Sequence, residues 1–247
     1  SAASDVYKRQ IMATATEMYE QNEPINYEQK CLCVLVLDTS GSMNADNAIG
    51  QLNQGLQTFK SQIMNDETAR DRLEIAIVSF NSEIKVELQP SLISEIEMPT
   101  LKASGQTQLV RAIEEAQQVI KDRKDYYKSK GLTYYRPWIV VMTDGDPYPA
   151  NQDIDGIAQK IQEDADAKKY VFFMIGVGNE VHDDVLSKLT TSQFPAMRMD
   201  AVNFAEFFQW LSASATVVVN SDDLTDSNVS IPQPTWAQGF VIGTDTE

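Results

Sequence analysis

The stretch CLCVLVLDTSGS, residues 31–42, decides the fold of this 247-residue chain. Its first seven residues are all apolar, as in a parallel β-strand that is buried on both faces. The polar run DTSGS, residues 38–42, follows, and these residue types favour a turn into a helix. Apolar residues then recur every three or four positions over residues 49–63, which predicts an amphipathic helix that begins near Ala45. The stretch therefore predicts a strand, a polar loop and a helix, the repeating unit of an α/β fold.

The rest of the chain continues this alternation of strands and helices. Further buried strands are predicted at residues 73–80, 138–143 and 170–177, and short ones at 83–88, the edge strand of a hairpin, and 196–199. Helices are predicted at residues 109–120, 153–168, 183–189 and 204–211. Strands that alternate with helices are joined by crossovers, which make neighbouring strands parallel. The expected fold class is α/β, a doubly wound, mostly parallel sheet with helices on both faces.

Composition excludes several classes of function. The chain has 36 acidic and 20 basic residues and a net charge of −16, so we expect no nucleic-acid partner. No apolar run approaches the roughly 20 residues of a membrane-spanning helix, so we expect no membrane partner. The single histidine, His182, excludes a His-rich zinc site. Cys31 and Cys33 would share one face of a strand, too close in the chain for a disulfide, which favours a reducing, cytoplasmic location.

We expect one principal domain, flanked by segments of different character. Residues 1–10 (SAASDVYKRQ) resemble a translated sequencing adapter, and we exclude them from the fold as a scar. Residues 11–29 form an N-terminal extension, and residues 30–220 form the domain. Residues 221–247 carry no Lys or Arg and form an acidic C-terminal tail or clasp. Trp236 and Phe240 are expected to pin this tail to the domain.

Polar side chains stand where predicted strands and loops meet helices. Asp38, Ser40 and Ser42 follow the first strand, Thr107 precedes a helix, and Asp144 follows the strand at residues 138–143. Ligands of open parallel sheets bind beyond the carboxyl ends of the strands. Two carboxylates and three hydroxyls suit Mg²⁺, Mn²⁺ or Ca²⁺ better than zinc, and leave a coordination position for an outside ligand. The simpler alternative for residues 38–42 is a helix-capping turn without a metal.

These residues resemble the metal-ion-dependent adhesion site of the von Willebrand factor type A (VWA) domain. Residues 38–42 match its D-x-S-x-S motif, and Thr107 and Asp144 match its threonine and second aspartate. The resemblance implies that Ser40, Ser42 and Thr107 contact Mg²⁺ directly, while Asp38 and Asp144 act mainly through water and hydrogen bonds. It also implies a protein partner that supplies an acidic residue to the metal. Gln106 departs from the small residue that is frequent there.

Longer stretches resemble the TerY family of bacterial tellurium-resistance VWA proteins. They are VLVLDTSGSM at residues 34–43, LNQGLQTF at 52–59, ASGQT at 103–107, YYRPWIVVMTDGD at 134–146 and FFQWLS at 207–212. This resemblance implies a cytoplasmic adaptor in tellurium resistance or stress response, with a protein kinase or phosphatase as partner. It implies a binding protein and not an enzyme.

Two alternatives remain beside this interpretation. A metal-dependent hydrolase could use the same oxygens, although the cluster holds no evident general base apart from the ligands themselves. A metal carrier would need a closed site or soft ligands. Elsewhere, the basic segment KDRKDYYKSK, residues 121–130, is typical of a solvated helix end, or of a docking patch on an acidic protein.

Overall fold

The computed structural model describes residues 24–178, 182–191, 194–199, 204–221, 231, 232 and 234. Within them the strands form one six-stranded sheet in the order β3-β2-β1-β4-β5-β6. The bounds are β1 Cys31–Asp38, β2 Leu73–Phe80, β3 Ile84–Leu92, β4 Trp138–Thr143, β5 Val171–Val177 and β6 Met197–Met199. All neighbours pair in parallel except β2 and β3, which form the predicted hairpin. The expected fold class is confirmed.

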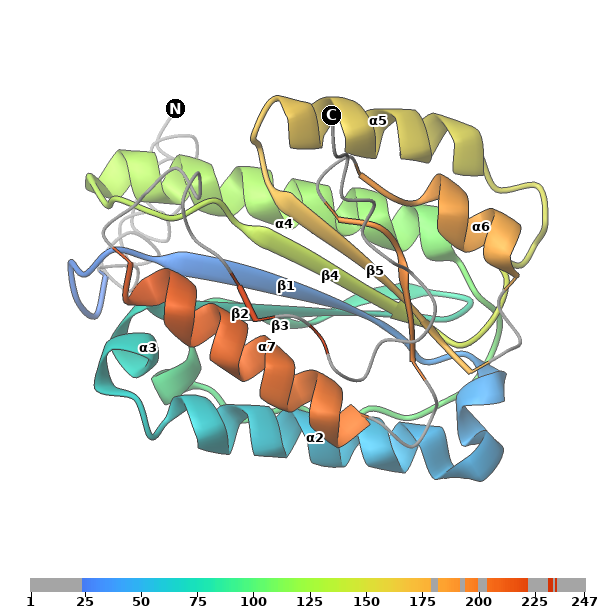
Figure 1. The fold of residues 1–247 in the computed structure, drawn as a ribbon, viewed down its shortest axis with the longest axis horizontal. Helices are drawn as coiled ribbons and strands as arrows, with labels where there is room; N and C mark the ends of the chain where they lie inside the picture. Colours follow the sequence, from blue (N-terminus) through green and yellow to red (C-terminus); the bar gives the residue numbers. More distant parts are fainter. Residues whose placement is uncertain are drawn as a thin grey trace, which may run out of the picture.

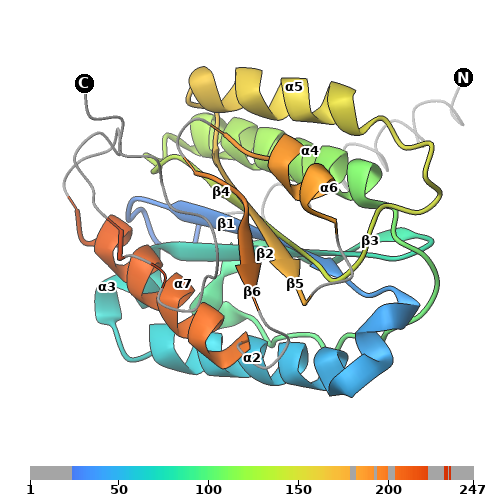
Figure 2. The ribbon, with the colours of Figure 1, turned by 45° about the vertical axis from the view of Figure 1, so that its right-hand side comes forward.

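Helices cover both faces of the sheet, as Figures 1 and 2 show. On one face lie α2 (Ala48–Ile63), α3 (Glu67–Arg72) and α7 (Phe204–Val219), and on the other α4 (Leu109–Lys130), α5 (Ile154–Asp166) and α6 (Asp183–Lys188). Two hydrophobic clusters fill the layers between helices and sheet. Strand β1 contributes side chains to both clusters, because Leu35 faces the α2 side of the sheet and Val36 faces the α4 side. This double burial explains its continuous apolar sequence.

One close contact joins two helices of the same layer. Gly55 of α2 lies against the ring of Phe208 in α7, where an added Cβ would meet ring carbons at 2.4 and 2.6 Å.

Cys31 and Cys33 are buried in β1 as reduced thiols. No helix in the described part of the chain is long and apolar enough to cross a membrane.

Local backbone geometry changes some predicted helix bounds. The helix after β1 begins at Ala48, since residues Gly41–Asn47 form a 3-10 segment in which Asp46 and Asn47 take positive φ. The helix that begins at Leu109 includes the predicted helix end at residues 121–130 and stops at Gly131, whose φ is +67°. The short helix α3 was not predicted. Residues 1–23, Trp236 and Phe240 lie outside the described residues, so the predictions for them stay predictions.

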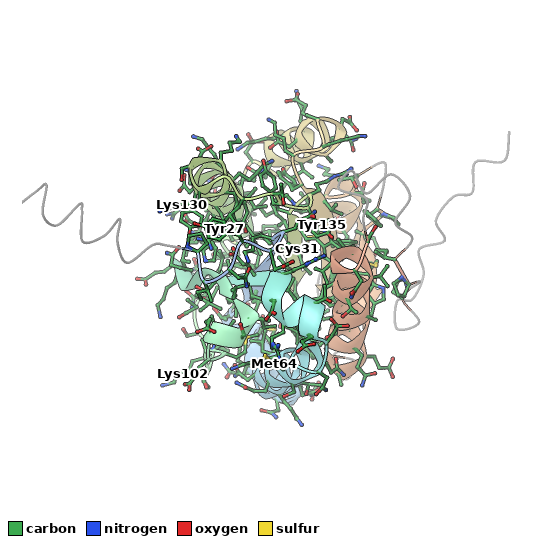
Figure 3. The ribbon with its side chains drawn as sticks, turned by 90° about the vertical axis from the view of Figure 1, so that its left-hand side faces the viewer. Tyr27, Cys31, Met64, Lys102, Lys130 and Tyr135 are labelled. Atoms are coloured by element: carbon green, nitrogen blue, oxygen red, sulfur yellow. The ribbon has the colours of Figure 1, made fainter. Side chains whose placement is uncertain are left out.

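The two ends of the sheet carry different chemistry. The carboxyl end of β1 lies between β2 and β4, and its two neighbours are reached by crossovers on opposite faces. Such a switch point is where open α/β sheets bind ligands. Figure 3 views the amino end, with Cys31 and Tyr135 near its centre and Lys130 of α4 to their upper left.

A buried ion pair occupies the amino end. Glu74 of β2 is 2% exposed and accepts hydrogen bonds from Arg123 Nε (2.7 Å) and Nη2 (2.6 Å) and from the Tyr127 hydroxyl (2.6 Å). Arg123 and Tyr127 belong to the basic segment at residues 121–130. The prediction of a merely solvated helix end is therefore wrong for this inner face, because long-range pairing with β2 draws it into the core.

Candidate metal centre

Asp38 ends β1 and is held from two sides. Its carboxylate is 1% exposed. Oδ1 accepts a hydrogen bond from the Ser40 backbone N–H at 2.7 Å, and Oδ2 accepts one from the Thr143 hydroxyl at 2.5 Å. Thr143 is the last residue of the neighbouring strand β4, so strand pairing places its hydroxyl beside Asp38. Both carboxylate oxygens are thereby oriented at the carboxyl edge of the sheet.

Ser40, Ser42 and Asp144 form a connected cluster beside Asp38. The Ser42 hydroxyl donates to Asp144 Oδ1 at 2.8 Å, and Ser40 Oγ lies 3.5 Å from the same oxygen. The two serine hydroxyls are 2.9 Å apart. Ser40 is buried, Ser42 is exposed, and Asp144 is partly exposed. The cluster therefore runs from the protein interior to the surface and is accessible from solvent on its outer side.

Thr107 reaches this edge on a loop that backbone hydrogen bonds join to residues 38–42. Ser104 N–H donates to the Thr39 carbonyl at 2.8 Å, and Gly41 N–H donates to the Gly105 carbonyl at 3.0 Å. Gly105 has a φ of +76°, and an added Cβ would lie 2.7 Å from Ser82 Oγ, so the loop requires glycine there. Thr107 itself is 6% exposed. The structure thus brings all five predicted residues to one edge of the sheet.

The electrostatics of Asp38 favour a cation from outside the chain. Burial raises the pKa of Asp38 to about 7, while hydrogen bonds from Ser40 and Thr143 lower it and the nearby Asp144 raises it. Among the described residues, no Lys, Arg or His forms an ion pair with Asp38. Burying a carboxylate without a positive partner is costly. A divalent cation bound at this edge would offset that cost.

The donor set fits a hard divalent cation. Serine and threonine hydroxyls and aspartate carboxylates are oxygen ligands, which Mg²⁺, Mn²⁺ and Ca²⁺ prefer. Within the described ranges, no group of three or more His, Cys, Asp and Glu side chains could hold a metal. A metal at this edge would therefore depend on Ser40, Ser42 and Thr107 together with the two aspartates.

Two features beside the cluster were not predicted from the sequence. Asp146 accepts a hydrogen bond from His182 N–H at 2.8 Å and also contacts His182 Nδ1, which ties the loop after β4 to the start of α6. Tyr148 is 57% exposed and exchanges backbone hydrogen bonds with Thr107 at 3.0 and 3.3 Å. The Thr143 bond to Asp38 was missed as well, although Thr143 directly precedes the predicted ligand Asp144. The spacing of residues along the sequence predicts none of these three contacts.

Comparison with solved structures shows the same fold in several proteins. A von Willebrand factor type A protein from Catenulispora acidiphila matches 76% of this chain with a TM-score of 0.55 at 15% identity, and this chain covers 43% of its length. The vWF domain of the type V pili tip protein Mfa5 from Porphyromonas gingivalis matches 81%, with a TM-score of 0.55 at 14% identity, and is covered completely. The pilus adhesin SpaC from Lactobacillus rhamnosus GG matches 78%, with a TM-score of 0.59 at 12% identity, and 31% of it is covered.

These structural matches establish the fold and nothing finer, because the identities are low. This chain spans less than half of the length of the Catenulispora acidiphila protein. No curated protein sequence matches the chain. A family model described as von Willebrand factor type A domain matches residues 33–210, which is most of the chain. The match includes both strands that present Asp38 and Asp144, and we conclude that the chain belongs to the von Willebrand factor type A domain family.

Proposed function

We propose that the carboxyl edge of the sheet binds a divalent cation, with Mg²⁺ as the preferred ion. The bound cation would in turn bind an acidic residue of a protein partner. The observation that carries this proposal is Asp38, a buried carboxylate with no ion-pair partner in the described part of the chain, surrounded by oriented hydroxyls. VWA domains commonly mediate interactions between proteins, which supports an adaptor and not an enzyme.

The arrangement of the side chains supports an open site. Asp38 is fixed from behind by Thr143, so its position does not depend on the partner. Ser42 and Asp144 are hydrogen-bonded to each other on the outer side, where solvent reaches them. When bound, the cation would retain an exchangeable position that a carboxylate oxygen can take. The acidic surface of this chain opposes an acidic partner at long range, so recognition would depend strongly on the metal.

Tyr148 extends the proposed contact surface beyond the metal. Its side chain is largely exposed, and its backbone is paired with that of Thr107. Aromatic side chains with a polar end are enriched in protein interfaces. We propose that the Tyr148 ring packs against the partner next to the metal-bound carboxylate.

The experiment is a pull-down from a native lysate with Mg²⁺, with EDTA, and with Mg²⁺ restored after EDTA. We expect the partner only when Mg²⁺ is present. Thr107→Ala and Tyr148→Ala should each weaken its retention without unfolding the domain. Tyr27→Ala is the matched control, because Tyr27 is 68% exposed at the opposite end of the molecule. Retention that is equal with and without EDTA would contradict the proposal.

A finer proposal concerns the biological setting. The sequence stretches that resemble TerY proteins support a cytoplasmic complex in tellurium resistance or stress response, with a protein kinase or phosphatase as partner. Mass spectrometry of the proteins released by EDTA tests it. A kinase or phosphatase among them supports the setting, whereas metal-dependent partners of other classes would refute it and leave the metal-dependent adaptor role intact.

A further inference from the structure

A groove with an excess of positive charge lies between α4 and α5, on the sheet face opposite α2 and α7. These two helices run side by side in both ribbon views (Figures 1 and 2). The groove has a volume of about 470 Å³. Five lysines line it, against three acidic residues; the lysines are Lys121, Lys124, Lys128, Lys160 and Lys169. We call it the lysine groove. Its charge is opposite in sign to the −16 of the whole chain.

The lysines are arranged along the groove and are only partly neutralised. Lys121, Lys124 and Lys128 follow each other at three and four residues, so they lie on one side of α4. Lys121 and Lys160 form no hydrogen bond or ion pair with any residue that the structure describes. Burial and the nearby Lys128 and Lys169 lower the pKa of Lys124. Like charges this close destabilise the helix, so the array is costly unless an anion binds to it.

Hydrogen bonds fix the polar side chains beneath the lysines. Gln117 is 9% exposed, and its amide nitrogen donates to the Tyr170 hydroxyl at 2.8 Å. The Tyr170 hydroxyl donates to Asp164 Oδ2 at 3.2 Å, and Lys169 Nζ donates to Asp164 Oδ1 at 2.6 Å. Asp164 therefore neutralises Lys169, whereas Lys121 and Lys160 keep their charge for an anion from outside the described residues.

We propose that the lysine groove binds an acidic, extended segment of a partner protein. Carboxylates of that segment would pair with the lysines, above all with Lys121 and Lys160, which no described residue neutralises. The wall of the groove on α4 runs from Glu114 to Lys128, about 21 Å at the helical rise. A six-residue extended peptide spans about 20 Å. A row of carboxylates along an extended peptide matches a wall of this length better than one inorganic anion does, and the overall negative charge disfavours nucleic acid.

The test uses the full chain in EDTA, so that the carboxyl edge of the sheet does not contribute. Fluorescence anisotropy would follow binding of a labelled hexaglutamate peptide. We expect saturable binding that weakens with added salt. Lys121→Glu and Lys160→Glu should each weaken it by about five-fold, whereas Lys102→Glu, a charge-matched change at an exposed lysine in a loop far from the groove, should leave it unchanged.

A double variant tests whether both helices take part. Lys121 lies on α4 and Lys160 on α5. Lys121→Glu/Lys160→Glu should weaken peptide binding by about 25-fold, the product of the two single effects, with folding checked by circular dichroism. No peptide binding by the wild type would overturn the proposal, as would equal weakening by Lys102→Glu. Displacement of the peptide by sulfate at matched charge concentration would also overturn it, since it would show an anion site with no preference for a peptide. None of these results would affect the proposed metal site.

Discussion

Two buried carboxylates at opposite ends of neighbouring strands have opposite surroundings. Glu74, near the amino end of β2, is 2% exposed and is paired with Arg123 and Tyr127. Asp38, at the carboxyl end of β1, is 1% exposed, and Ser40 and Thr143 are its only hydrogen-bond donors among the described residues. The first carboxylate is neutralised by a side chain of the protein itself. The second is oriented by neutral donors, which leaves its charge for a cation that the described part of the chain does not supply.

The comparison separates a structural carboxylate from one that is available for binding. Burial and sequence position alone do not distinguish the two, since both residues lie in buried strands. What differs is the partner that the fold brings to each one. Changes at the amino end should therefore alter folding stability and not metal binding, and changes at the carboxyl edge should do the reverse.

The largest effect is expected at the amino end. Arg123→Met leaves Glu74 buried without its cation and should lower the free energy of unfolding by about 3–5 kcal/mol. The double variant Arg123→Met/Glu74→Leu removes both charges and should recover most of that loss. Urea unfolding measures both. If Arg123→Met lowers the free energy of unfolding by less than the double variant does, the ion pair between Arg123 and Glu74 does not stabilise the amino end.

The next effect is expected at Asp38 and depends on metal. With EDTA, Asp38→Asn should leave the free energy of unfolding unchanged or raise it, because the buried charge is removed. The amide oxygen can still accept from the Ser40 N–H, and the amide nitrogen can donate to the Thr143 hydroxyl, which then donates to the Gly145 carbonyl at 3.0 Å. At a Mg²⁺ concentration one hundred times the dissociation constant, the wild type should gain about 2.7 kcal/mol and the variant nothing. Thermal unfolding with and without Mg²⁺ checks this. A gain of the same size in the variant would place the metal elsewhere.

A smaller effect is expected for Tyr127→Phe. The change removes one hydrogen bond to the Glu74 carboxylate and should cost about 1.5 kcal/mol at neutral pH. The stabilisation by Mg²⁺ should remain that of the wild type. Urea unfolding in Mg²⁺ and in EDTA provides both values, and a change in the Mg²⁺ effect would show that the two ends are coupled.

The smallest effect is a difference in alkaline stability. Burial raises the pKa of Tyr127 and of Tyr170, so the folded chain keeps both protons at a pH where the unfolded chain releases them. The stabilisation is complete below about pH 10 and is lost as the pH rises further. At pH 10.5, Tyr127→Phe should avoid about 0.8 kcal/mol of the wild-type loss. If the free energies of unfolding of the wild type and of Tyr127→Phe fall in parallel as the pH rises, Tyr127 does not retain its proton in the folded chain.

The sequence predicted the elements that local patterns encode. The strands at Leu73–Phe80 and Trp138–Thr143 have the predicted bounds, because continuous apolar runs mark strands that are buried on both faces. The later start of α2 was not predicted, since it depends on the positive φ of Asp46 and Asn47. The short helix α3 carries too few residues for a periodic pattern.

The sequence also predicted the residues of the candidate site but not what holds them. Asp38, Ser40, Ser42, Thr107 and Asp144 were found because their spacing matches a motif and the strand order converges on one edge. The bond from Thr143 to Asp38 joins residues 105 apart, and the pairing of Arg123 with Glu74 joins residues 49 apart. Such pairs follow from strand register and helix packing, which hydrophobic periodicity does not determine.

Direct titration of Mn²⁺ into the 247-residue chain, followed by calorimetry, tests the central claim most directly. Mn²⁺ suits the same oxygen ligands as Mg²⁺. The account predicts saturable binding by the wild type, its loss in Asp38→Asn and Asp144→Asn, and undiminished binding in Glu83→Gln, a change at an exposed carboxylate in the β2–β3 hairpin. Undiminished binding in Asp38→Asn and Asp144→Asn, or no binding by the wild type, would contradict it.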